Sequence, residues 1–397
     1  MKKLMILGGS ENQLPLIKSS KELGYQTVLC DYSEDNIGKG YSDIFYCVST
    51  LDKEAVLEVA LKEKIDGIIT NSEPAMPTAA YVGNELKLPS NPYNSIVILS
   101  RKDLFREFLR KNGFNCPQSY YTDNYKDAIE NITGFKMPLM VKPIDSSGSR
   151  GVSRINSISE LKEAFDYAIS FSKSKHVIIE EFIERIHDYM IGGDIFVLNG
   201  KVVFWGLMNC LRDSKVNIYV PVGKSYPAFI SDEQFDIIQD TIDLLLKKLK
   251  ISFGAFNVEL MFGSDNKLFL IEMNPRNGGN KIPEILKIIT DVDLIKLTVQ
   301  ASIGVNNLKL SYDSKGKYIS TYILHSEENG ILKEIKYSES IKDNIIKVSQ
   351  NKKIGDKVER FTNADKLIGI IFLQFKSLDE MIYKLDDIKE LIEIEIE

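Results

Sequence analysis

The sequence predicts a protein of mixed α/β and α+β class, built from three consecutive segments. Over residues 1–91, apolar strand-like runs alternate with amphipathic helical patterns, an order typical of parallel sheets. Over 306–397, short strands surround one helical pattern, as in α+β folds. Between them, residues 254–280 contain two apolar runs separated by a turn signal, which predicts an antiparallel hairpin.

The N-terminal segment repeats a strand–helix unit. The expected elements are a strand at 3–9, a helix at 12–24, a strand at 25–32, a helix at 52–64 and a strand at 66–71. This βαβαβ order predicts a parallel, doubly wound sheet.

Two acidic residues follow the strands of this predicted sheet. Asp31 ends the second strand, where a dinucleotide-binding domain would hold its ribose-binding acid. However, the glycines after the first strand do not continue as GxGxxG, which argues against an NAD-binding oxidoreductase. Glu73 follows the third strand, as a substrate contact or as part of a helix N-terminus.

The composition argues against several kinds of partner. Of 397 residues, 44% are hydrophobic and 27% charged, and the formal net charge is −6. A negative balance without a basic cluster argues against nucleic-acid binding. No apolar run approaches the ~20 residues that span a bilayer, so no membrane partner is expected. Four scattered cysteines without metal-ligand spacing predict reduced thiols in a cytoplasmic protein.

The hairpin at 254–280 places four polar side chains together. With Asp265 and Asn266 as the central turn residues, Glu259 lies directly opposite Glu272, and Asn257 lies opposite Asn274. Two opposed carboxylates repel each other unless a cation lies between them. Carboxylate and amide oxygens suit Mg²⁺ held jointly with phosphate, so Glu259, Glu272 and Asn274 are predicted metal ligands. The alternative is an exposed hairpin face with accidental carboxylates.

Arg276 follows this metal-ligand pattern by two residues. Its planar guanidinium would offer two parallel donors to a phosphoryl group or a carboxylate.

The strand–turn–strand with its Glu and the run EMNPR resembles the metal-binding signature of the ATP-grasp superfamily of carboxylate–amine and carboxylate–thiol ligases. The resemblance implies a Rossmann-like domain (1–91), an ATP-grasp domain (92–305) with a mobile lid (about 116–180) and a small α+β domain (306–397). It is similar in particular to bacterial L-amino acid ligases and carbamoyl-phosphate-synthase-like proteins.

Two lysines are candidates for contacts to a triphosphate. Lys102 lies in the first turn of a predicted helix (95–113), with Ser100 and Asp103 spaced like a capping box; a cation there is unfavourable unless an anion is nearby. Lys142 is the one charged residue of a short apolar strand, and at the strand end it should bury little surface. The resemblance implies that Lys102 contacts the α-phosphate and Lys142 the α- and β-phosphates, with Lys142 also catalytic.

A loop rich in small residues follows Lys142. Such loops bring backbone N–H groups against phosphates, although a plain hairpin loop is the alternative. The resemblance implies that this loop covers the β- and γ-phosphates through Ser146, Ser147, Gly148, Ser149 and Gly151.

The resemblance also implies an adenosine site after the next strand. The run Glu180-Glu181-Phe182-Ile183 is similar to the hinge whose backbone groups read adenine. Asp188 falls at the spacing of a ribose-binding carboxylate, with His187 as the rival. The stretch 205–230 is expected to be irregular and to shape a substrate pocket, with Arg212 and Lys215 as its charged candidates.

These observations predict an ATP-dependent ligase that uses ATP and Mg²⁺, with Mn²⁺ as an alternative ion. It would activate a carboxylic acid as an acyl phosphate and join it to an amine, with Arg276 stabilising the acyl phosphate. The alternatives are a biotin-carboxylase-like or purine-biosynthetic ATP-grasp enzyme, an NAD-binding oxidoreductase, and a nucleotide-binding regulator without turnover. A homodimer remains open.

Overall fold

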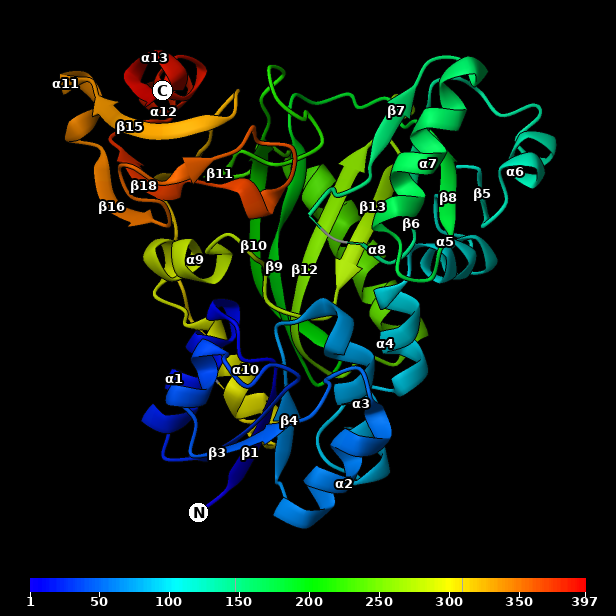
Figure 1. Cartoon of the computed structure of the whole chain (residues 1–397), viewed down its shortest axis with the longest axis vertical. Coiled ribbons are helices and arrows are strands. Elements are labelled where there is room, and N and C mark those ends of the chain that lie inside the picture. Colours follow the sequence, from blue (N-terminus) through cyan, green and yellow to red (C-terminus); the bar gives the residue numbers. More distant parts are fainter. Residues whose placement is uncertain (147, 309) are drawn as a thin grey trace.

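The N-terminal part of the computed structural model, which describes residues 1–146, 148–308 and 310–397, is a four-stranded parallel sheet in the order β3-β2-β1-β4 (Figure 1). Its strands are β1 (Lys3–Leu7), β2 (Gln26–Asp31), β3 (Ile44–Cys47) and β4 (Gly67–Ile69), and its helices are α1 (Leu14–Glu22), α2 (Lys53–Glu63) and α3 (Met76–Glu85). The last four residues of β1 are buried, as expected for a strand covered on both faces. The parallel sheet is confirmed, but the predicted order lacked the edge strand β3.

Two helices connect this sheet to the central part of the chain. They are α4 (Tyr93–Ser100) and α5 (Lys102–Lys111), separated at Arg101, whose φ of −132° and ψ of 123° are extended. The predicted capping box is wrong, because the Ser100 hydroxyl donates to the Ile96 carbonyl and Asp103 accepts from Arg101.

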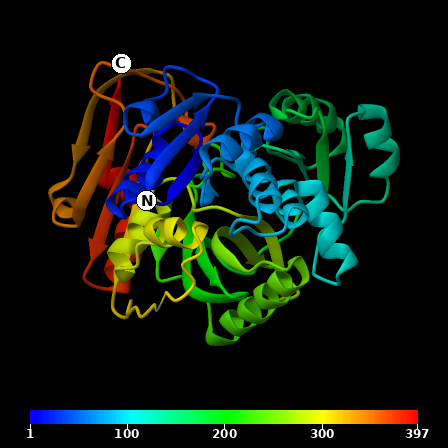
Figure 2. The same ribbon diagram turned by 90° about the horizontal axis from the view of Figure 1, so that it is seen from below.

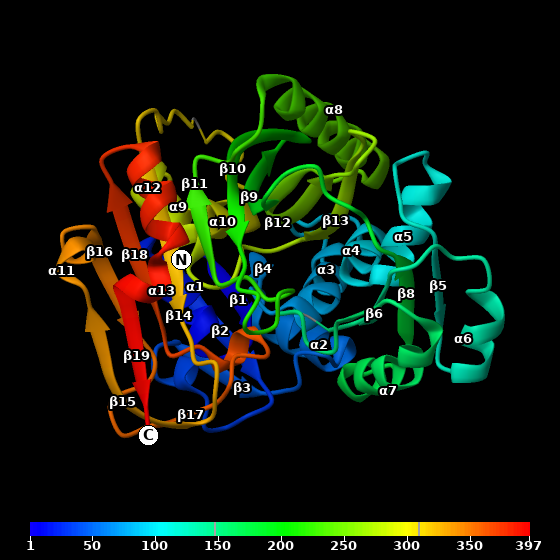
Figure 3. The ribbon, with the colours of Figure 1, turned by 90° about the horizontal axis from the view of Figure 1, so that it is seen from above.

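A small antiparallel sheet of four strands, in the order β5-β8-β6-β7, lies to one side of the eight-stranded sheet that forms the centre of the molecule (Figure 3). Its elements are β5 (Ser119–Thr122), α6 (Tyr125–Asn131), β6 (Leu139–Pro143), β7 (Ser153–Ile155), α7 (Leu161–Phe171) and β8 (Val177–Glu181). Apolar side chains of α7 pack on this sheet: Leu161, Ala164, Phe165 and Ala168 are all buried there. The small-residue loop connects β6 with β7.

An eight-stranded sheet, in the order β13-β12-β9-β10-β11-β14-β18-β16, forms the centre of the molecule. Its first five strands by position are β13 (Leu268–Asn274), β12 (Phe253–Phe262), β9 (Met190–Leu198), β10 (Lys201–Leu211) and β11 (Gly223–Tyr226). Helix α8 (Asp232–Leu249) packs on it, and begins with a capping box of Ser231 and Gln234. The expectation of irregular chain throughout 205–230 is wrong, since β10 and β11 occupy much of it.

The C-terminal segment continues the same central sheet. Strand β14 pairs with β11, and β18 and β16 extend the sheet beyond it. The C-terminal elements are β14 (Tyr318–Leu324), β15 (Gly330–Tyr337), α11 (Glu339–Lys342), β16 (Ile345–Gln350), β17 (Lys357–Val358), β18 (Gly369–Phe375), α12 (Leu378–Asp386), α13 (Ile388–Leu391) and β19 (Ile392–Ile396). The predicted boundary at 305/306 therefore separates two parts of one sheet, and the division into three domains stays a prediction.

Two helices return the chain from the central sheet to the N-terminal sheet. These are α9 (Ile282–Thr290) and α10 (Leu294–Ser302). Val299 of α10 shares a buried cluster with Leu4 and Ile6 of β1, and Figure 2 shows both helices beside the N-terminal strands. Among the described residues, no helix is long and apolar enough to cross a membrane.

Candidate active site

A cleft of about 1850 Å³ lies between the N-terminal sheet, the central sheet and the small sheet β5-β8-β6-β7, which we call the lid sheet. It brings together most of the residues that the sequence singled out. Those that line it are Lys102, Lys142, Ser146, Gly148, Ser149, Glu180, Glu181, Phe182, Ile183, Asp188, Glu259, Glu272, Asn274 and Arg276. Ser147 lies outside the described residues. Gly151 does not line the cleft; a side chain there would meet Phe171 of α7 at 3.0 Å.

The predicted hairpin register is confirmed at the site, although the turn was placed wrongly. Glu259 pairs with Glu272, and Asn257 pairs with Asn274. Nearer the turn the pairing shifts by one residue, because the loop closes from Gly263 to Lys267. A β-bulge, which is one extra residue on β13 between Leu270 and Glu272, restores the predicted register at the two carboxylates.

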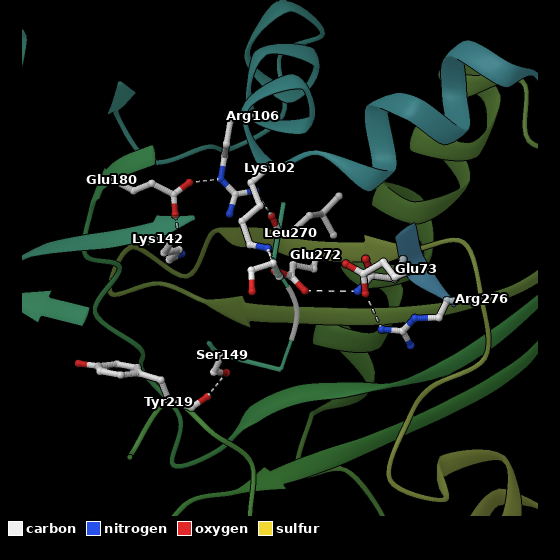
Figure 4. Close-up of polar contacts among 12 residues, drawn as sticks. Glu73, Lys102, Arg106, Lys142, Ser149, Glu180, Tyr219, Leu270, Glu272 and Arg276 are labelled. Carbon is white, nitrogen blue, oxygen red and sulfur yellow. Dashed lines mark hydrogen bonds and ion pairs between the residues drawn. The ribbon is translucent and has the colours of Figure 1, made fainter. Parts of the chain in front are cut away.

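The two opposed carboxylates have different surroundings. Glu272 accepts an ion pair from Lys102 at 2.9 Å and a hydrogen bond from Asn274 at 3.3 Å (Figure 4). Glu259 is half-buried, and its side chain makes no hydrogen bond or ion pair with any described residue. Burial opposes the charge of Glu272, but Lys102 outweighs it and lowers the pKa of that carboxyl. One carboxylate of the pair is thus balanced within the protein, whereas the other is open to a cation.

A further carboxylate of the cleft, Glu180, is held between two cations. Its side chain is 2% exposed, and it accepts from Arg106 Nε at 2.6 Å and from Lys142 Nζ at 2.5 Å (Figure 4). Although burial favours the neutral acid, these two cations lower the pKa of Glu180 to about 2. The expectation that Lys142 buries little surface is wrong, because its side chain is only 14% exposed.

Two residues of the loop after β6, Ser146 and Ser149, are hydrogen-bonded to opposite sides of the cleft. Lys102 Nζ donates to the Ser146 carbonyl at 2.8 Å, which links α5 to the loop. At the other end, the Ser149 hydroxyl donates to the Tyr219 carbonyl at 2.7 Å (Figure 4). The loop therefore bridges the cleft between Lys102 and the segment after β10.

The chain after β8 offers one free backbone N–H group to the cleft. The N–H of Phe182 donates to the Pro138 carbonyl at 3.0 Å. By contrast, the N–H of Ile183 has no partner among the described residues. Asp188 is exposed and lines the cleft, whereas the ring of His187 accepts from the Phe262 N–H and does not line it. Of the two rivals, Asp188 alone faces the cleft.

Arg276 links the hairpin to the N-terminal sheet. One guanidinium nitrogen pairs with Glu73 at 2.8 Å (Figure 4). Another donates to the Asn277 carbonyl at 2.9 Å. Both side chains are about one-seventh exposed, at 14% and 15%. Glu73 thus enters the site as the partner of Arg276.

The acid Asp31 is used by the backbone. Its two oxygens accept from the N–H groups of Gly9, at 2.6 Å, and Ser33, at 2.8 Å. This carboxylate stabilises the turn after β1, which leaves it unsuited to hold a ribose.

Sequence reasoning missed Asp194, which lies in β9 and is 0% exposed. Burial raises its pKa to about 6, against the hydrogen bonds that it accepts from the Gly278 N–H and the Asn257 amide. A side chain at Gly278 would meet the Asp194 carboxylate at 2.7 Å and the Asn257 amide nitrogen at 2.8 Å. Asp194 therefore fixes the loop that follows Arg276. The sequence signal that could have identified this residue was a lone carboxylate in an otherwise apolar strand.

Arg106 was also missed. It lies one helical turn after Lys102 on α5 and beside the buried Phe105 and Leu109, so helical spacing could have placed both cations on one face.

The fold defined by these elements is the ATP-grasp fold. Over the whole length of both proteins, the structure matches the L-amino acid ligase from Bacillus licheniformis with a TM-score of 0.83 at 20% identity, covering 100% of this chain and 99% of that one. It also matches the biotin carboxylase domain of the Hydrogenobacter thermophilus 2-oxoglutarate carboxylase, solved with MgADP, with a TM-score of 0.70 at 17% identity, covering 100% and 91%.

The chain belongs to the family described as carbamoyl-phosphate synthase L chain, ATP binding domain, which matches residues 101–310. The large chain of carbamoyl phosphate synthase from Thermotoga petrophila is 23% identical over 386 residues, which are 92% of this chain and 34% of that protein. This chain therefore spans about a third of the length of that relative.

Replacing Asp194 by Asn should change how stability depends on pH. The native pKa, about 6, lies above the ordinary value of 3.8, so the native state binds the extra proton between these values. The wild-type free energy of unfolding should therefore fall as pH rises from about 4 to 6, by a part that the variant lacks. Thermal melts across this range measure it. Asp240→Asn, at an exposed position on α8, is the control; equal slopes in all three proteins would contradict the prediction.

Proposed function

We propose that the chain is an ATP-dependent ligase that activates a substrate carboxylate as an acyl phosphate and joins it to an amine, releasing ADP and phosphate. The observation that carries this proposal is the pair of opposed carboxylates, Glu259 and Glu272, on the face of the hairpin that lines the cleft. An amino-acid or peptide-like amide ligase is the first candidate. A biotin-carboxylase-like or purine-biosynthetic enzyme is the alternative within the superfamily.

The donor set at the hairpin fits Mg²⁺, or Mn²⁺, shared with a nucleotide. Glu259, Glu272 and Asn274 supply two carboxylates and an amide oxygen, which suit an ion that takes its other ligands from phosphates and water. Consistently, no group of three or more His, Cys, Asp or Glu side chains in the described part of the chain could hold a metal alone. When bound, such an ion neutralises phosphate oxygens during phosphoryl transfer.

The chain's own side chains would position the triphosphate. Lys102 and Lys142 line the cleft on either side of the loop after β6, and their ammonium groups suit the phosphate oxygens. Glu180 acts on Lys142 rather than on the nucleotide, because both of its oxygens already accept from cations. The free N–H of Ile183 suits an acceptor on the adenine edge, and Asp188 suits the ribose hydroxyls.

Arg276 would stabilise negative charge on the acyl phosphate and on the adduct formed with the amine. Its position beside Glu73 supports a role at the border between nucleotide and substrate, since the pair joins the hairpin to the N-terminal sheet. No side-chain nucleophile is needed for this chemistry. The four cysteines, all unpaired, support a cytoplasmic location, and homodimer formation stays a prediction.

The test is a screen for ADP release over pairs of amino acids with Mg·ATP, together with thermal-shift measurements with Mg·ATP and with NAD. We expect stabilisation by Mg·ATP but not by NAD, and ADP release that requires an acid substrate. Stabilisation by NAD alone would overturn the proposal in favour of an oxidoreductase. Nucleotide binding without any ADP release would favour a regulator.

Glu272→Gln should abolish turnover while the protein stays folded. The variant keeps the shape of the side chain but loses the charge that a cation at the hairpin needs, so ADP release should fall by about 10²-fold or more. The measurement is ADP release, with melting temperature as the check of folding. Glu130→Gln, at an exposed position on α6, should behave as wild type; near wild-type turnover in Glu272→Gln would remove the metal assignment.

Arg276→Lys should separate binding from chemistry. Lysine keeps the charge but loses the planar fork, and a lost oriented donor at a developing oxyanion costs about 10²–10³ in rate. We therefore expect slower acid-dependent ADP release with Mg·ATP affinity roughly unchanged. Arg110→Lys, exposed on α5, is the matched control. Equal losses in affinity and rate would instead make Arg276 a ground-state phosphate clamp.

A further inference from the structure

Lys224 of β11 is a buried cation on the wall of the cleft. It is 7% exposed, and its Nζ lies 2.7 Å from the Cys210 thiol. No carboxylate of the described residues lies within ion-pair distance of it. A buried ammonium without a counter-charge is costly, so its charge calls for a partner that the protein itself does not supply.

Glycine makes room for this ammonium group on the neighbouring strands. A side chain at Gly192 of β9 would meet Lys224 Nζ at 2.8 Å and Cys210 Sγ at 3.0 Å. Gly192 is also the residue that pairs with Glu259. Since adjacent strands are about 5 Å apart, the ammonium lies beside the carboxylate pair of the hairpin, about one strand spacing from it.

Two arginines of the cleft wall lie in the same region. Arg185 and Arg212 both line the cleft, and neither forms an ion pair with any described residue. Partial burial and the nearby charge of Arg212 lower the pKa of Arg185, although Asp188 opposes this shift and the side chain is exposed. Lys224 thus contacts Cys210 directly, Arg212 follows Cys210 by two residues and donates to the Tyr219 carbonyl, and all three cations line the same cleft.

Two carboxylates of this part of the fold, Asp213 and Asp194, are committed to other groups, whereas Glu259 and Asp188 have no side-chain partner among the described residues and form no ion pair with the three cations. Asp213 accepts from His325 at 2.9 Å and pairs with Lys389. Asp194 accepts from the Gly278 N–H and the Asn257 amide. On the nucleotide side of the cleft, in contrast, Lys102, Arg106, Lys142 and Arg276 each pair with a glutamate.

We propose that Lys224, with Arg185 and Arg212, binds an anionic group of a substrate, a carboxylate or a phosphate, other than the carboxylate that is activated. This inference rests on the proposed ligase function and narrows its substrate class: the acid or the amine carries a further negative charge. The activated carboxylate would be met by Arg276 at the hairpin, whereas Lys224 lies beside Gly192, on the strands away from Arg276. A charge-assisted hydrogen bond to such a group should be worth about tenfold in affinity or more.

The test uses matched pairs of probes that differ in one charge. They are L-alanine and L-alaninamide, L-glutamate and L-glutamine, and O-phospho-L-serine and L-serine, titrated calorimetrically into the full chain with and without Mg·ADP. We expect the charged member of at least one pair to bind about tenfold tighter or more. The pair concerned identifies the source of the charge, as an α-carboxylate, a side-chain carboxylate or a phosphate.

Variants assign this preference to the cation cluster. Lys224→Met, which keeps the volume and the apolar contacts, should remove the preference and leave Mg·ADP affinity unchanged. Arg212→Gln is less buried and should weaken the same preference even where Lys224→Met fails to fold. Lys248→Met, exposed on α8, should retain it.

Two results would overturn the proposal: no preference in any pair for the wild type, or a preference that survives in both cluster variants. Failure of the ligase proposal appears elsewhere, as absence of substrate-dependent ADP release, and leaves the binding comparison readable by itself.

Discussion

Compensation of buried charge holds this cleft together. Glu180 is fully buried, Glu272 and Glu73 are partly buried, and each of these carboxylates is paired with a cation from another element. Glu180 joins the lid sheet to α5, Glu272 joins the hairpin to α5, and Glu73 joins the N-terminal sheet to the hairpin. Because losing either partner would leave a buried charge unpaired, the pairs fix how the parts of the chain meet.

Under the proposed function, the same pairs would prepare the nucleotide side of the cleft for phosphates. Lys102 and Lys142 would exchange a glutamate oxygen for a phosphate oxygen, which is a similar acceptor, without first being desolvated. Glu180 keeps Arg106 when Lys142 turns to a ligand, and Glu272 keeps Asn274. Each carboxylate therefore retains a polar partner through the exchange, which keeps its cost small.

The hairpin part of this site could be predicted from the sequence, because Glu259, Glu272 and Arg276 lie close together in the chain. The pairing of Glu259 with Glu272 needed only a hairpin, and it holds because a β-bulge offsets the one-residue error at the turn. The partners of Arg106 and Asp194 could not be predicted, since they lie 74 and 84 residues away. Local patterns carry no information about such contacts. The edge strand β3 was missed because its four residues are at most half-buried.

The orientation of Arg276 depends on all of these long-range contacts together. Glu73 holds its guanidinium from the N-terminal sheet, and the next residue, Asn277, donates to Asn71 and Thr298. The Asp194 carboxylate in turn accepts a hydrogen bond from the Gly278 N–H and so fixes the position of that residue. The arginine next to the predicted metal ligands is thus aimed by the N-terminal sheet, α10 and β9 at once. This explains why a short motif, readable in the sequence, becomes a site only when the whole chain has folded around it.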